Sequence, residues 1–112
     1  MFLENFRYYY RDMKKPMYEL SSKVWLYPGM SGWHFVSVNK KVSREIKELF
    51  GQSGRGFGSI PVKVTTGTTA WDTSIFPDKK TATYILPLKV AVRKKENITA
   101  GKQLSFSIEI KT

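Results

Sequence analysis

Basic side chains that could bind phosphate or carboxylate groups gather on two predicted helices. The candidate anion-binding residues are Lys40, Lys41, Lys89, Arg93 and Lys94. The 112-residue chain also carries a formal net charge of +10, which attracts polyanions such as nucleic acid. The sequence therefore predicts an anion-binding surface. A solvated basic surface without a specific partner is the alternative interpretation.

Aromatic residues and one of these arginines offer a second kind of site. Aromatic rings can stack on bases or line a cleft for a small molecule. The candidate pocket residues are Tyr27, Trp33, Trp71 and Arg93. Aromatic residues at alternating strand positions more often pack in the core, so a structural role is the alternative. This small-ligand pocket, which could be enzymatic, is our second hypothesis.

Catalytic and metal chemistry has few candidate residues. His34 is the single histidine, and the chain has no cysteine, which excludes a disulfide and a thiolate zinc site. Glu45 and Glu48 stand among lysines on a predicted helix, where a solvated face explains them. The sequence therefore favours a non-enzymatic binding module that uses no cofactor and no metal.

A glycine-rich stretch, GQSGRGFGSIPV at residues 51–62, raises the question of a phosphate-binding loop. Such a loop follows a strand and begins a helix, whose N-terminal N–H groups then point at the anion. Here the order is reversed, because the glycines follow a predicted helix and lead into a strand. We interpret Gly51 as a helix C-cap before a connector. An anion-binding nest built on Arg55 is the alternative.

Hydrophobic periodicity predicts the elements that position these residues. Alternation is typical of strands, and apolar residues at i, i+4, i+7 and i+8 after Asn39, a plausible N-cap, indicate a helix. We predict a mainly β domain, a small barrel with two short helices. The strands are predicted at 18–26, 33–38, 60–66, 69–76, 81–88 and 103–110, a turn at 77–80, and the helices at 40–50 and 89–98.

The chain divides into a short N-terminal part and one domain. Residues 1–16 differ in composition and are predicted to be a tail or a peripheral helix, whereas residues 17–112 carry the strand pattern. No apolar run approaches the roughly 20 residues that a membrane-spanning helix needs. The first residues also lack the apolar segment of a signal peptide, so we expect a cytoplasmic protein that does not bind membranes.

An internal repeat is visible in the sequence. Residues 35–46 align with residues 83–94 at an offset of 48, which matches Val42 with Val90. Two strand–helix–strand units packed about a pseudo-twofold axis would close a barrel within one chain. The expected state is therefore a monomer or weak dimer. A chance match is the alternative, because the aligned stretch is short.

Two family resemblances support this architecture. The stretch YILPLKVAVRKKENITAGKQLSFSIEI resembles the swapped-hairpin barrel of the AbrB/MazE-type regulators, which bind DNA. Residues 18–110, with YPGMSGWHFVSV, GFGSIPVKVTTG and WDTSIFP, look like the bacterial domain-of-unknown-function family 1905. This resemblance implies a single-chain double-split β-barrel and no established activity.

Overall fold

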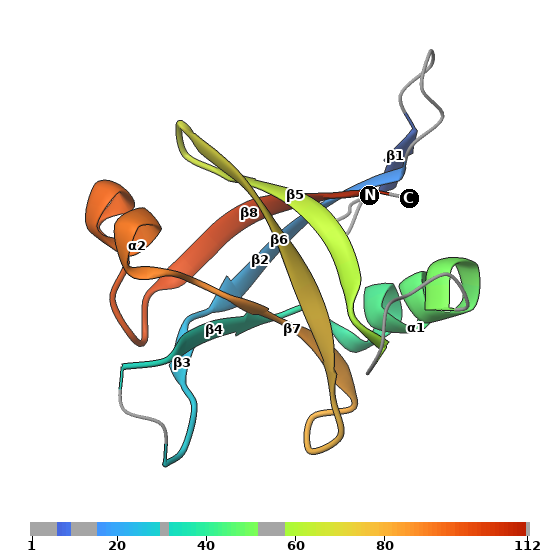
Figure 1. Cartoon of the computed structure of the whole chain (residues 1–112), viewed down its shortest axis with the longest axis horizontal. Helices are drawn as coiled ribbons and strands as arrows, with labels where there is room; N and C mark the ends of the chain where they lie inside the picture. Colours follow the sequence, from blue (N-terminus) through green and yellow to red (C-terminus); the bar gives the residue numbers. More distant parts are fainter. Residues whose placement is uncertain (1–6, 10–15, 30–31, 52–57, 112) are drawn as a thin grey trace.

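The computed structural model describes residues 7–9, 16–29, 32–51 and 58–111. The described residues form eight strands and two helices (Figure 1). In chain order these are β1 (Arg7–Tyr9), β2 (Pro16–Lys23), β3 (Trp25–Leu26), β4 (His34–Ser37), α1 (Lys40–Phe50), β5 (Ile60–Thr66), β6 (Thr69–Asp78), β7 (Thr83–Pro87), α2 (Val90–Glu96) and β8 (Gln103–Ile110).

The strands form one curled antiparallel sheet that resembles half of a barrel (Figure 1). Their order across the sheet is β1-β2-β8-β5-β6-β7-β4-β3. Only Val24 separates β2 from β3, although these strands lie near opposite ends of that order. The predicted mainly β fold with two helices is confirmed. No helix in the described ranges is long and apolar enough to cross a membrane.

Alternation along the strands places the core inside the curl. In β5, Ile60, Val62 and Val64 are fully buried, and in β8 four consecutive even-numbered positions from Leu104 to Ile110 are buried. Both strands have the bounds that the sequence predicts. Leu26, the last residue of the predicted strand at 18–26, is 50% exposed.

Other boundaries also differ from the sequence prediction. β6 continues through the predicted turn at 77–80 as far as Asp78, because its last residues pair with β7. The Asp78 carboxylate then accepts hydrogen bonds from the backbone N–H and hydroxyl of Thr81, which moves the turn towards β7. α2 ends at Glu96, earlier than predicted. In the N-terminal part, residues 7–9 form β1, a strand paired with β2.

A pseudo-twofold axis relates two strand–helix–strand units, β4-α1-β5 and β7-α2-β8. The first strands of the two units pair with each other, and so do the last strands. Val36 pairs with Leu86 at the centre of the β4–β7 ladder, 50 positions apart. Two flanking hydrogen bonds repeat at the same spacing: Val38 N donates to Tyr84 O, and Leu88 N donates to His34 O, both at 2.9 Å.

The predicted repeat is therefore real, but its offset of 48 is wrong. The N-caps Asn39 and Lys89 are also 50 positions apart. At this spacing, Val42 corresponds to Val92, and these two residues are 4% and 3% exposed. Val90, the predicted match for Val42, is 53% exposed. The sequence alignment failed because matching lysines and valines lie two positions from their structural counterparts.

One buried hydroxyl fixes α1 against β7. The Ser43 hydroxyl donates to Val38 O at 2.9 Å and accepts from Tyr84 N at 3.0 Å. Asn39 caps the same helix, because its side-chain oxygen accepts from Val42 N at 2.8 Å. The start of α1 is therefore fixed both to the loop before it and to the strand beneath it.

One carboxylate fixes α2 to the β5–β6 hairpin. Glu96 accepts hydrogen bonds from the hydroxyls of Thr69 and Thr68 and from the Thr68 backbone N–H. The Thr69 hydroxyl is the main reason that the pKa of the Glu96 carboxyl lies below its ordinary value of 4.5. The ionised form of Glu96 is therefore the one that holds the helix.

Replacing Ser43 by alanine should destabilise the protein without changing its fold. The buried Tyr84 N–H and Val38 carbonyl would each lose a partner, so the free energy of unfolding should fall by roughly 1–3 kcal/mol. Urea unfolding monitored by circular dichroism measures this change. The exposed Ser105→Ala change is the matched control and should stay within about 0.5 kcal/mol of the parent. Equal stability of both variants would contradict the anchoring role of Ser43.

Replacing Glu96 by glutamine should change how stability depends on pH. A carboxyl with a depressed pKa in the folded state stabilises the fold fully above its unfolded pKa, and this contribution is lost as the pH falls through the folded pKa. The parent should therefore be more stable than Glu96→Gln at pH 7, and the difference should shrink below pH 4.5. Thermal unfolding across this range tests it. Glu48→Gln is the control, and a difference independent of pH would refute the prediction.

Candidate functional site

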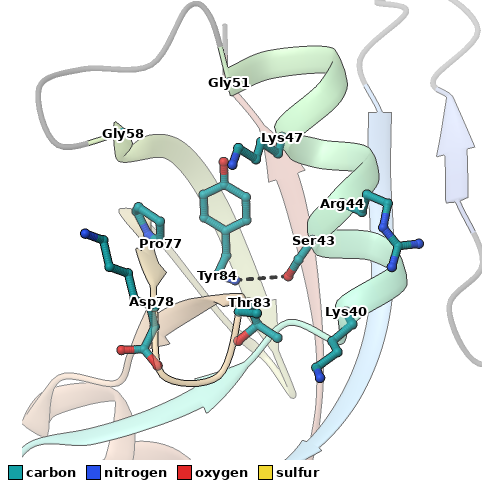
Figure 2. Close-up of a pocket in the computed structure, with 12 residues that line it drawn as sticks. Lys40, Ser43, Arg44, Lys47, Gly51, Gly58, Pro77, Asp78, Thr83 and Tyr84 are labelled. Carbon is teal, nitrogen blue, oxygen red and sulfur yellow. Dashed lines mark hydrogen bonds between the residues drawn. The ribbon is translucent and has the colours of Figure 1, made fainter.

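A cavity of about 840 Å³ lies between α1 and the turn that connects β6 to β7 (Figure 2). The helix contributes one wall, and the end of β6, the turn and the start of β7 contribute the other. Ser43 sets the distance between the walls, because it binds α1 to β7. The lining residues are Lys40, Ser43, Arg44, Lys47, Gly51, Gly58, Pro77, Asp78, Lys79, Ala82, Thr83 and Tyr84.

Four of these lining residues carry a positive charge. Lys40, Arg44 and Lys47 recur at i, i+4 and i+7 on α1, a spacing that places side chains on one helix face. Lys79 reaches the cavity from the opposite wall. All four are exposed, and none forms an ion pair with a carboxylate in the described part of the chain. In Figure 2, Lys47 extends toward Tyr84, whereas the Arg44 guanidinium extends along the outer side of the helix.

The remaining polar groups of the cavity do not cancel this charge. Asp78 is the one carboxylate among the lining residues, and Thr81 already donates two hydrogen bonds to it. Tyr84 is 5% exposed, and burial raises the pKa of its hydroxyl above the ordinary value of 10.0. That hydroxyl points toward the end of Lys47 in Figure 2 and stays protonated at neutral pH. The cavity therefore offers cations and a hydroxyl donor.

Glycine forms the rim of the cavity where the chain leads into β5. Gly58 has a φ of +76°, and a Cβ atom there would lie 3.3 Å from the Pro77 ring. A larger residue would be strained by its backbone and crowded by Pro77. The predicted helix C-cap, Gly51, also lines the cavity, but its φ of −61° is right-handed. Arg55, the candidate for an anion nest, lies outside the described residues.

The structure separates the predicted anion-binding residues into two groups. Lys40 and Lys41 belong to α1, and Lys40 alone of the five lines the cavity. Lys89, the N-cap of α2, and Lys94 are exposed near the other helix, and Arg93 is half-buried there. The two helices lie at opposite sides of the molecule (Figure 1). The five residues therefore do not form one continuous patch.

Two of the predicted aromatic pocket residues belong to one ring cluster. The centroids of Tyr27 and Trp33 lie 5.5 Å and 6.1 Å from that of Phe35. Trp25 also contacts this cluster, with its centroid 5.4 Å from Phe35. Trp71, on β6, instead packs against the hydrophobic core. Trp33 is 53% exposed, so the cluster ends in an open aromatic surface.

The Arg93 side chain contacts the backbone next to this ring cluster. Its Nε donates to Leu88 O at 2.9 Å, and Nη2 lies 3.4 Å from Gly32 O, directly before Trp33. His34 Nδ1 lies 2.9 Å from the same carbonyl oxygen. Because a carbonyl oxygen can only accept, the ring proton of neutral His34 is on Nδ1. The structure thus brings Arg93, Trp33 and Tyr27 into one region.

The pseudo-twofold axis explains why this region differs from the α1 cavity. Arg93 corresponds to Ser43, and both side chains donate to the carbonyl before their helix, Leu88 O and Val38 O. Gly32 corresponds to Ala82, and both have a positive φ, +82° and +58°. The short serine leaves space beside α1, whereas the long arginine reaches across to the opposite loop beside α2.

A second cavity, of about 520 Å³, lies on the outer side of β2, β8 and β5. Its lining is mostly uncharged and polar, with Glu19 as the one carboxylate. The lining residues are Glu19, Leu20, Ser21, Thr65, Thr66, Gly67, Gln103, Ser105, Phe106 and Ser107.

Within the described ranges, no group of three histidine or carboxylate side chains could hold a metal ion.

Sequence reasoning missed most of the α1 cavity. The spacing of Lys40, Arg44 and Lys47 was a usable signal, because it places three cations on one helix face. Lys79 and Pro77 appeared only as turn residues, and Tyr84 only as a strand residue. Their meeting with α1 depends on tertiary packing, which local patterns do not encode.

Comparison with protein-family models identifies the family of this chain. A search of curated proteins finds no match. The family model named Domain of unknown function (DUF1905) matches residues 21–108, which is most of the chain and covers the two strand–helix–strand units except for the last two residues of β8. The resemblance expected from the sequence motifs is thereby confirmed at the level of the family, and the chain belongs to the DUF1905 family.

Proposed function

We propose that the protein is a non-enzymatic binding module that takes an anionic ligand in the cavity beside α1. The observation that carries this proposal is that four cationic residues line one cavity, with Asp78 as the one lining carboxylate and with no ion pair to these cations among the described residues. The predicted anion-binding function is kept, with Lys40 as the shared residue, but its centre moves from a two-helix surface to the α1 cavity.

The ligand that suits this cavity carries several negative charges in a row. Lys40 and Lys47 are seven positions apart on α1, so their Cα atoms are separated by about 10 Å along the helix axis. The positive end of the helix dipole adds to the potential near Lys40. A chain of linked phosphate groups can contact both lysines, whereas a single carboxylate would reach only one.

The family resemblance also supports a finer description of the fold. We infer a double-split barrel in which β2 and β3 act as one long strand that bends at Val24. In support, Val24 N donates to Lys102 O, and Val24 O accepts from Gly101 N, which ties the bend to the turn before β8. Such a barrel needs no strands from a second chain, so we propose a monomer or a weak dimer.

Tripolyphosphate should bind the protein at low ionic strength, and Lys40→Gln combined with Lys47→Gln should weaken this binding by roughly 150-fold or more. Each lost charge-assisted hydrogen bond contributes about 1.5–3 kcal/mol. Isothermal titration calorimetry measures the affinity, which should also fall as salt is added.

The matched control combines Lys23→Gln with Lys63→Gln, two exposed lysines that do not line the cavity. Both double variants lose the same net charge. An equal loss of affinity in both would show that only net charge matters. Absence of any tripolyphosphate binding by the parent would remove the proposal.

The oligomeric state gives a separate test of the barrel. We expect multi-angle light scattering to report a mass near 12.9 kDa at micromolar concentration. The reason is that both ladders between the two units form within one chain. An obligate dimer that unfolds as it dissociates would contradict the single-chain barrel.

A further inference from the structure

Trp33 is the most exposed tryptophan among the described residues. It lies beside the cationic residues at α2 and does not line the α1 cavity. Trp33 is 53% exposed, although its ring is held against Phe35 within a cluster of four aromatic side chains. A ring that is supported on one side and open elsewhere is a stacking platform. It loses little conformational freedom when a second planar group binds.

Cationic groups stand next to this platform. Arg93 is placed at the Gly32 carbonyl, one residue from Trp33, by its bonds to Leu88 O and Gly32 O. Those bonds use Nε and one N–H of Nη2, so the remaining guanidinium donors can bind another acceptor. The exposed Lys89, the N-cap of α2, lies four positions before Arg93 and follows Leu88, whose N–H donates to His34 O beside Trp33. Lys89 forms no ion pair with a carboxylate of the described residues.

The shape of this surface selects an extended ligand. A small-molecule site usually encloses most of its ligand, whereas Trp33 offers an open surface with half of its area in solvent. Stacking on an open ring with phosphate contacts at its edge is how proteins bind unpaired nucleic acid strands. A duplex would not present a free base face to Trp33.

We propose that the Trp33–Arg93 surface binds single-stranded nucleic acid, with one base stacked on Trp33 and the neighbouring phosphates contacted by Arg93 and Lys89. This site shares no residue with the α1 cavity. The two sites lie on opposite sides of the pseudo-twofold axis. The proposed site also gives a role to two predicted pocket residues, Trp33 and Arg93. In this proposal they form an open surface and not a closed pocket.

The test uses the full chain and a fluorescently labelled 12-nucleotide oligo-dT, with binding followed by anisotropy at low salt. Trp33→Ala should weaken binding by about 5- to 150-fold, the usual range for loss of one stacked base. Trp33→Phe should retain most of the affinity, because phenylalanine also stacks. Trp33 is half exposed, so these variants should fold, which circular dichroism confirms.

Three controls separate the possible explanations. The Lys40→Gln and Lys47→Gln double variant should bind oligo-dT nearly as the parent does, even if tripolyphosphate binding is lost. A duplex of equal length should bind more weakly than the single strand. Oligo-dT binding that is unchanged in Trp33→Ala, or matched by the duplex, would overturn the proposal. Equally tight, Trp33-dependent binding of polyglutamate would overturn it too, and would point to an acidic protein partner.

Discussion

The antiparallel pairing of β4 with β7 is the constraint on which the rest of the molecule depends. Its centre, the pair Val36 and Leu86, lies on the pseudo-twofold axis, and both side chains are fully buried. This ladder fixes the starts of both helices, since each follows directly from a paired strand. The same ladder places the β3–β4 hairpin beside α2 and the β6–β7 hairpin beside α1. Both candidate sites are built at these two helix–hairpin junctions.

Divergence between the two units decides what each junction can bind. Ser43 and Arg93 occupy corresponding positions and satisfy corresponding carbonyls, so the local fold tolerates either side chain. The serine buries its whole side chain and leaves the cavity to Lys40, Lys47 and Lys79. The arginine carries its own charge into the junction. One architecture thus yields a basic cavity at one end and an aromatic, cationic surface at the other.

The sequence predicted the elements better than their relation in space. Alternation located β5 and β8 with their observed bounds, and periodicity with Asn39 located α1, because these signals are local. The repeat was visible, but letter matching set its offset two residues from the one that backbone pairing imposes. Arg93 and Trp33 were predicted as pocket residues from residue type alone, and the structure places them in one region. The α1 cavity was missed because Gly58, Pro77 and Lys79 meet Lys47 only through packing of distant segments.

The helix starts show a conflict between stability and charge. An acidic residue in the first turn would favour the helix dipole, yet neither helix has one, and α1 begins with Lys40 and Lys41. Each misplaced cation costs a few tenths of a kcal/mol to about 1 kcal/mol. At α1 the Asn39 cap offsets this cost, whereas the α2 N-cap, Lys89, makes no side-chain capping bond. Stability alone therefore does not explain lysine at both positions. At α1, the anion binding proposed above would offset this cost, because a bound phosphate would neutralise Lys40 and interact favourably with the same helix dipole.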